Sequence, residues 1–173
     1  SVLAFTDGTA IVPMVSSMDH KRAGDGDTGL NTGGMGTVAP NPYYTPEIAQ
    51  VCMETIFLPT LAAMRAEGCP FKGCLYFGLM LTPDGPKVIE YNCRFGDPET
   101  QVVLPLLKTD LLTIMQAVEA ETLADLTVEW SDGAAACVIL ASGGYPSHYE
   151  KGLPITFPAA FPANVTCYHA GDK

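Results

Sequence analysis

Five polar side chains that could bind a metal ion or a phosphate fall within ten residues of the chain: Glu90, Asn92, Arg94, Asp97 and Glu99. They stand in VIEYNCRFGDPETQ, residues 88–101, although only 16% of the chain is charged. Glu90, Asn92 and Arg94 are spaced two residues apart, so a strand would place them on one face. Carboxylate and amide oxygens suit Mg²⁺, and a planar guanidinium suits phosphate or carboxylate. A solvated strand face with a surface ion pair would use the same residues, and spacing alone does not choose between the two.

A glycine-rich segment earlier in the chain offers backbone groups to an anion. It is NTGGMG, residues 31–36 (the glycine loop), and consists of Asn31, Thr32, Gly33, Gly34, Met35 and Gly36. Glycines let successive N–H groups turn toward a phosphate. The segment lacks the Gly-Lys-Ser/Thr of a Walker loop and the spacing of a dinucleotide fingerprint. Asp19-His20-Lys21-Arg22 precedes it and adds two cations, although a flexible loop and an exposed charged turn would account for the same residues.

Other polar groups in the sequence do not indicate a site. Residues 25–29, DGDTG, resemble part of a calcium loop but lack the third acidic ligand and the last glutamate of an EF-hand, so we interpret them as a solvated turn. His148 and His169 stand alone, and no motif of a catalytic serine or cysteine accompanies them, which disfavours a hydrolase with a nucleophile triad. Asp97 and Glu99 could act as an acid/base pair, but nothing beyond their being carboxylates supports a glycosidase.

Two predicted hairpins would position the polar stretch. Asp7-Gly8 separates VLAFT from TAIVPMV and indicates a two-residue turn within residues 2–15. Residues 72–92 form the second hairpin around Thr82-Pro83-Asp84-Gly85. The strand bearing Glu90 is then paired, and its polar face can line a cleft. The opposite face, with Ile89, Tyr91 and Cys93, suits a core.

Helices and loops connect these hairpins. Thr45 as N-cap, Pro46 at the first position and Gly68 at the end predict a helix, which Pro59 should kink. Thr109 or Asp110 to Leu123 is predicted to be a second helix. Residues 17–42 are predicted to be a long polar loop, functional or disordered. The apolar run 134–142 predicts a fully buried strand, and residues 147–173 are loop-rich.

Bulk properties limit the possible partners. The 173 residues suffice for one domain or slightly more, and the net charge of −10 argues against non-specific binding to nucleic acid or to an anionic membrane. No apolar run is expected to cross a bilayer, and SVLAFTDGT lacks the basic region of a signal peptide. The six cysteines show no CxxC pair, which predicts mostly buried free thiols in a reducing cytosol.

The order of the segments resembles one known family. DHKR at 19–22, NTGGMG at 31–36, a helix, and a hairpin that leads into RFGDPETQ at 94–101 (the signature loop) resemble segments of phosphoribosylamine–glycine ligases, which are ATP-grasp enzymes. GGYP at 143–146 and YHAG at 168–171 resemble the start of that family's C-terminal domain. The resemblance implies an α+β fold. Residues 1–127 would be the C-terminal half of an ATP-grasp domain, an antiparallel sheet flanked by helices, and residues 128–173 the beginning of a small β-rich C-terminal domain.

The resemblance also implies a reaction in the cytoplasm, in de novo purine synthesis. ATP, glycine and 5-phosphoribosylamine would give ADP, phosphate and glycinamide ribonucleotide through a glycyl phosphate, without a nucleic-acid or membrane partner. Glu90 and Asn92 would hold Mg²⁺ or Mn²⁺. Arg94 would neutralise the transferred phosphoryl group or the glycine carboxylate, and Asp97 and Glu99 would orient the amine or shape the loop. The residues implied in binding substrate or phosphate are Asp19, Lys21, Arg22, Asn31, Thr32, Gly33, Gly34, Met35 and Gly36.

Length is where the chain departs from this family. The family has an N-terminal domain and the front half of the ATP-grasp domain before the segments found here, so we expect a piece of a longer ligase that is inactive alone. Two alternatives remain at this point. One is another ATP-grasp carboxylate–amine ligase or carboxylase, against which RFGDPETQ speaks, and the other is a non-catalytic binding module. The strand CLYFGLML carries no acid, which leaves the metal to Glu90 and Asn92.

Overall fold

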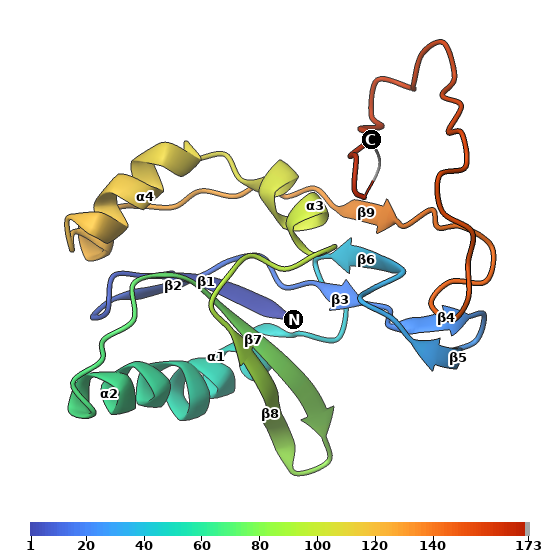
Figure 1. Ribbon diagram of the computed structural model, residues 1–173. Helices are drawn as coiled ribbons and strands as arrows, with labels where there is room; N and C mark the ends of the chain where they lie inside the picture. Colours follow the sequence, from blue (N-terminus) through green and yellow to red (C-terminus); the bar gives the residue numbers. More distant parts are fainter. Residues whose placement is uncertain (172–173) are drawn as a thin grey trace.

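A four-stranded antiparallel sheet forms the centre of the computed structural model, which describes residues 1–171 (Figure 1). The strands follow the order β2 (Ile11–Pro13), β1 (Val2–Thr6), β7 (Gly73–Thr82) and β8 (Gly85–Asn92). Helices cover both faces of this sheet. The predicted α+β class and both predicted hairpins are confirmed.

The first hairpin turns through a four-residue loop and not through the two-residue turn predicted at Asp7-Gly8. The last strand pair is Thr6 with Ile11. Within the loop, Oδ1 of Asp7 accepts hydrogen bonds from the N–H groups of Thr9 (2.9 Å) and Ala10 (2.7 Å). A buried aspartate that satisfies two backbone donors stabilises this wider loop.

The second hairpin contains a β-bulge beside the polar residues of β8. Leu79 pairs with Val88, but the next pair along the ladder is Gly78 with Glu90, so Ile89 is an extra residue. A bulged residue leaves the ladder, and the side chain of Ile89 is 62% exposed. The prediction that Ile89 faces the core is therefore wrong.

A continuous helical segment covers one face of the sheet (Figure 1). It consists of α1 (Pro46–Cys52), the π-helical η1 (Met53–Phe57) and α2 (Leu58–Ala66). Thr45 caps it by accepting the N–H of Ile48 at 3.4 Å, and Gly68 follows its end with φ +74°, as predicted. The π-helical turn precedes Pro59, which has no N–H to donate. The core on this face consists of Val2, Ala4, Cys52, Ile56, Phe57, Leu61, Leu75 and Phe77.

The same helical segment, Pro46–Ala66, is long and apolar enough to cross a membrane by length and composition alone. This differs from the expectation that no apolar run of the chain could cross a bilayer. Cys52, Phe57 and Leu61 on its inner side are buried against the sheet, however. The core helix of a globular fold meets the same criterion, but only 22% of this segment is buried and Val51 and Leu58 are exposed, so packing on the sheet accounts for part of its apolar residues.

The cysteines are less buried than predicted. All six are free thiols, but only Cys52 and Cys74 are buried. Cys69, Cys93 and Cys167 are exposed, and Cys137 is half-buried. Cys93 lies beyond the end of β8, where alternation along the strand no longer directs a side chain to the core.

Residues 17–42 form short strands, so the prediction of a long loop is wrong. β3 (Met18–Asp19) and β6 (Gly36–Ala39) join β9 (Ala135–Val138) in a three-stranded antiparallel sheet. β4 (Arg22–Gly24) and β5 (Thr28–Asn31) form a separate hairpin. Of the calcium-like residues 25–29, the first three make its turn and the last two begin β5, and all five are exposed. Backbone ladders need no apolar side chains, which is why the polar, glycine-rich sequence concealed them.

Short helices cover the other face of the central sheet (Figure 1). They are α3 (Thr100–Val103), the 3₁₀ turn η2 (Leu104–Leu106), α4 (Leu111–Glu119) and the 3₁₀ turn η3 (Leu123–Asp125). Asp110 caps α4 as predicted, but the helix ends before Leu123, whose N–H donates to Asp7. The buried core here consists of Leu3, Phe5, Met14, Ala39, Cys74, Tyr76, Val102, Val103, Leu106, Ile114, Val118 and Leu123.

The last strand is shorter and more exposed than predicted. Of residues 134–142, β9 includes only four, and Val138 is 75% exposed because β9 is an edge strand. No helix or strand follows it up to residue 171, which confirms the loop-rich prediction. β9 pairs with β6, and a division of the chain after residue 127 stays a prediction.

Candidate functional site

Glu90 and Asn92 project from the same face of β8. Asn92 pairs with Tyr76 and Glu90 with Gly78, so all four positions share the face that carries α3 and α4. Gly78 leaves room for Glu90, since a Cβ on Gly78 would lie 2.9 Å from Cγ of Glu90. The carboxylate of Glu90 is exposed, and no ion pair engages it within residues 1–171. Two hard oxygen ligands are thus presented side by side.

Glu99 lies beneath this face and is buried. Its Oε1 accepts hydrogen bonds from the hydroxyls of Tyr76 (2.9 Å) and Ser1 (2.9 Å), and these hydroxyls are 2.8 Å apart. Burial raises the pKa of Tyr76, so its phenol keeps the proton that it donates. Glu99 is 2% exposed, so of the two predicted roles, to orient the amine or to shape the loop, its burial favours the second. Its observed partners connect β1 and β7 to the signature loop.

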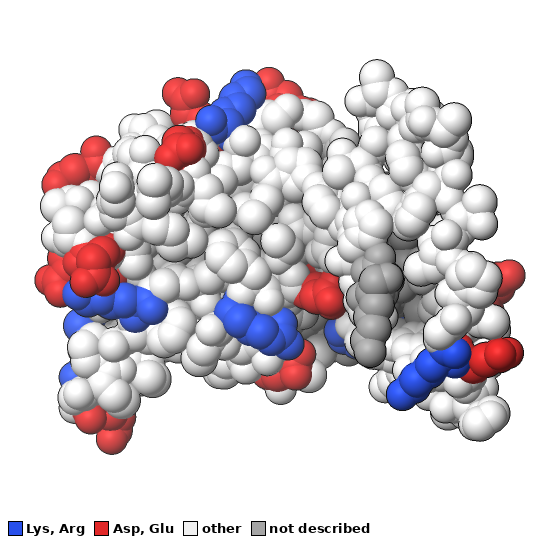
Figure 2. Space-filling view, turned by 45° about the horizontal axis from the view of Figure 1, so that its top comes forward, with Lys and Arg blue, Asp and Glu red and all other residues white. Residues whose placement is uncertain are grey.

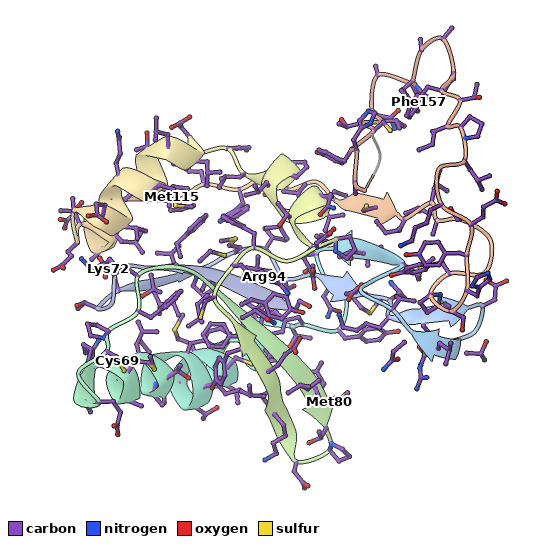
Figure 3. All side chains as sticks on the ribbon, in the orientation of Figure 1. Cys69, Lys72, Met80, Arg94, Met115 and Phe157 are labelled. Carbon is purple, nitrogen blue, oxygen red and sulfur yellow. The ribbon has the colours of Figure 1, made fainter. Side chains whose placement is uncertain are left out.

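The open side chains of the signature loop are Arg94 and Asp97. Arg94 stands where the chain leaves β8 toward α3, and its Nη1 donates to the carbonyl of Phe95 at 2.9 Å (Figure 3). Asp97 accepts a hydrogen bond of 2.7 Å from Nε2 of Gln101, one turn later. Phe95 anchors the loop by an edge contact with Phe5, with ring centroids 6.3 Å apart. The loop therefore has a buried anchor and an exposed charged side.

Asp19 and Lys21 form an ion pair at the edge of the same region. Nζ of Lys21 lies 2.5 Å from Oδ2 of Asp19, whose side chain is only 4% exposed, so Asp19 is not open to phosphate. Burial raises the pKa of Asp19 against the opposing effect of Lys21. Burial also lowers the pKa of Lys21, but the hydrogen bond to Asp19 and the charges of Asp19, Glu99 and Glu90 together raise it above its usual value. Lys21 is therefore a cation that lies near the carboxylates of Asp19, Glu99 and Glu90.

The glycine loop meets the signature loop at Gly34. A Cβ on Gly34 would overlap Pro98 and would lie 2.7 Å from Oδ1 of Asp19, and its φ is +141°. The segments DHKR, NTGGMG and RFGDPETQ are therefore in contact at one point. Within 1–171, Oδ1 of Asp19 and the buried hydroxyl of Thr37 have no hydrogen-bond partner.

The glycine loop does not, however, form the amide cradle expected from its sequence. The N–H groups of Thr32, Gly34 and Met35 donate to Lys21 O, to the Thr32 hydroxyl and to His20 O, at 2.8, 3.0 and 2.8 Å. A donor that is already bonded within the chain is not open to an anion.

Arg22 and Asn31 stand away from the other predicted site residues. They pair on the hairpin β4–β5, which lies far from β8 in Figure 1. Nη1 of Arg22 donates to the carbonyl of Gly29 at 2.9 Å. The structure therefore gathers Lys21, Gly34, Glu90, Asn92 and Arg94 near the signature loop and leaves Arg22 and Asn31 outside.

Sequence reasoning missed Tyr76, Ser1 and the glycines at 78 and 96. A Cβ on Gly96 would overlap Oε2 of Glu99, so this glycine makes room for the buried carboxylate. Alternation would have put Tyr76 on a defined face of β7, but its partner across the ladder depends on the bulge, which carried no recognisable signal in the sequence.

Comparison with known proteins places the chain in a family. Residues 1–100 match the model of the phosphoribosylglycinamide synthetase ATP-grasp (A) domain. The chain belongs to the phosphoribosylglycinamide synthetase family. A phosphoribosylamine–glycine ligase of Nostoc sp. is 50% identical over the whole chain, which covers 41% of that protein. The trifunctional purine biosynthetic protein adenosine-3 of Gallus gallus is 52% identical over 99% of the chain, which covers 17% of that protein.

A solved structure agrees with this family assignment. The crystal structure of the phosphoribosylamine–glycine ligase of Thermotoga maritima superposes with a TM-score of 0.81 at 37% identity, over 92% of this chain and 40% of that one. The chain thus spans about two fifths of the length of such synthetases.

Proposed function

We propose that the chain carries the metal-binding edge of an ATP-dependent ligase that joins glycine to 5-phosphoribosylamine. Relatives named as phosphoribosylamine–glycine ligases, at about half identity, support this reaction. The observation that carries the proposal is the pair Glu90 and Asn92 on one strand face, with Lys21 and Arg94 nearby. Phosphoryl transfer relies on positioning and on neutralisation of charge more than on a covalent nucleophile.

The proposed reaction has two steps that balance. A carboxylate oxygen of glycine attacks the γ-phosphorus of ATP, which releases ADP and forms glycyl phosphate. The amine nitrogen of phosphoribosylamine then attacks the acyl carbon, a C–N bond forms, phosphate leaves and the nitrogen loses a proton. In this proposal Arg94 faces the transferred phosphoryl group or the glycine carboxylate. The open carboxylate of Asp97 orients the amine, and Glu99 holds the loop that carries both.

The residues present fit the divalent cation that the family implies. Mg²⁺ typically takes one or two carboxylate or amide oxygens from a protein and completes its shell with water and phosphate. Glu90 and Asn92 supply two such oxygens, and Gly78 provides the space behind Glu90. Within residues 1–171, no cluster of three or more His, Cys, Asp or Glu could hold a metal by itself. When bound, Mg²⁺ or Mn²⁺ would neutralise phosphate oxygens of ATP.

The partners in this proposal are small molecules in the cytoplasm: ATP, glycine and 5-phosphoribosylamine. The chain carries a net charge of −10. Acidic and basic side chains are interspersed on the face seen in Figure 2, and no broad basic patch covers it. Such a surface is unsuited to the phosphate backbone of a nucleic acid.

Calorimetric titration of Mg²⁺·ATP tests the metal edge. Glu90→Ala and Asn92→Ala each remove one ligand, so each should weaken binding by at least about tenfold, the loss that even the outer-shell partners of a metal cause. Glu54→Ala is the matched control, because Glu54 is an exposed carboxylate on η1 and its loss should leave binding unchanged. Absence of binding to the unaltered chain, or binding by both variants that is as tight as binding by the unaltered chain, contradicts the proposal.

A further inference from the structure

A pocket lies between the signature loop with α3 and the last part of the described chain. Its volume is about 390 Å³, and it is lined by Gly96, Asp97, Thr100, Gln101, Leu104, Tyr168 and His169. Two segments about seventy residues apart in sequence therefore form its walls. Asp97 stands at its edge and belongs to the signature loop, so the pocket adjoins the proposed reaction site.

The polar groups of the pocket are mainly acceptors. Gln101 uses its Nε2 to donate to Oδ1 of Asp97 at 2.7 Å. Its Oε1 is buried and has no hydrogen-bond partner within the described chain. A buried acceptor without a donor is destabilising, and a bound molecule with O–H or N–H groups would offset that cost. The hydroxyl of Thr100 is already bonded to the carbonyl of Gly96.

The remaining walls are apolar or aromatic. Leu104 and the ring of Tyr168, which is 52% exposed, offer surfaces for C–H groups. Within residues 1–171, no lysine or arginine lines the pocket, so these residues provide no permanent positive charge for a phosphate. An aromatic ring next to carboxylate and amide acceptors fits a ligand that has an apolar face and several hydroxyl or amine donors. A sugar ring has both.

We propose that this pocket binds the pentose ring of the amine substrate, with the phosphate of that substrate outside it. This inference rests on the proposed function, which supplies a phosphorylated aminopentose as substrate. Gln101 and Asp97 accept hydrogen bonds from the ring hydroxyls or the amine, and Tyr168 covers the C–H face of the ring. The pocket would thereby place the nucleophilic nitrogen beside the signature loop.

Saturation-transfer NMR with ribose 5-phosphate tests this assignment, because that compound keeps the ring and its hydroxyls. The ring protons should receive saturation from the unaltered chain and lose most of it with Tyr168→Ala and with Gln101→Leu. Tyr43→Ala is the control, since Tyr43 is also an exposed tyrosine, lies between β6 and α1, and its loss should preserve the signal.

The result separates this inference from the proposed function. No saturation transfer, or an equal signal in Tyr168→Ala and the unaltered chain, overturns the pentose pocket. The titration of Mg²⁺·ATP into Tyr168→Ala is measured in parallel. In the unaltered chain, nucleotide binding without any pentose binding contradicts the pocket alone, whereas absence of nucleotide binding contradicts the proposed function. In Tyr168→Ala, intact nucleotide binding with loss of the pentose signal is the expected result.

Discussion

The signature loop contains two kinds of acidic residue that the sequence does not distinguish. Asp97 is exposed and Glu99 is buried, although they are two positions apart. The family resemblance implied the same role for both, to orient the amine or to shape the loop. Only the hydroxyls of Tyr76 and Ser1 above Glu99 reveal a positioning role, and these come from distant parts of the chain. The shared face of Glu90 and Asn92 could be predicted because spacing along a single strand was enough, whereas their role as metal ligands stays a prediction.

Tyr76→Phe tests the buried anchor by removing a single oxygen. Glu99 would lose a donor in a buried environment, so the variant should be destabilised by about 1–3 kcal/mol. Urea unfolding followed by circular dichroism measures this difference in the free energy of unfolding. Tyr43→Phe removes the hydroxyl of an exposed tyrosine and should change little. Equal stability of the two variants would argue that Tyr76 does not hold Glu99.

At the scale of elements, the bulge in β8 decides which way Glu90 and Asn92, the proposed metal ligands, face. On the turn side of the bulge, Val88 packs with the core under α1 and α2. If Ile89 took a regular place in the ladder opposite Gly78, Glu90 would alternate in phase with Val88 and would face those helices. The insertion directs Glu90 and Asn92 to the side of Tyr76 instead. A bulge re-aims side chains in this way near functional sites.

The strength of local signals decides which elements were predictable. Caps and turn residues marked the helix that begins after Thr45 and the turn at Thr82-Pro83-Asp84-Gly85, and both are present. β3 and β6 were missed because their pairing is between backbones of polar or small residues. α3 was missed because its four residues give no helical period. The strand predicted over residues 134–142 was apolar enough for a core but lies at a sheet edge.

Gly34→Ala tests the contact between the glycine loop and the signature loop. The added methyl group would overlap Pro98, and φ +141° disfavours any side chain, so a loss of about 1–3 kcal/mol of stability is expected from overpacking. Gly33→Ala is the control in the adjacent position, where a Cβ meets nothing within 4 Å. Thermal unfolding of both variants gives the comparison. A similar melting temperature for the two would mean that the loops do not depend on this contact.

At the scale of the whole molecule, two cores stabilise the central sheet from opposite faces. Neither core, with the residues packed against it, includes a residue beyond Cys137. The chain from residue 151 to residue 171 is exposed throughout. The end of the described chain therefore adds walls to the pentose pocket but no core.

Removal of all residues after Leu140 should leave the fold nearly as stable as before. Both cores remain, as does the bond from the Ile139 N–H to Met35 O, so the free energy of unfolding should change by about 0.5 kcal/mol or less, as for surface changes. Urea unfolding measures the change, and saturation transfer from the shortened chain to ribose 5-phosphate should be lost. A large drop in stability would show that the removed segment supports the cores.

The glycines at 34, 78 and 96 give the site a form of specificity that does not reside in any functional group. Each leaves a volume that a neighbour occupies: Pro98 beside Gly34, Glu90 beside Gly78 and Glu99 beside Gly96. Suppose that every charged and amide side chain of the site were placed on another scaffold in which these three spaces were filled. Such a protein would have the same functional groups but not the same arrangement of them. Part of what specifies this site is therefore the absence of a side chain at these three positions.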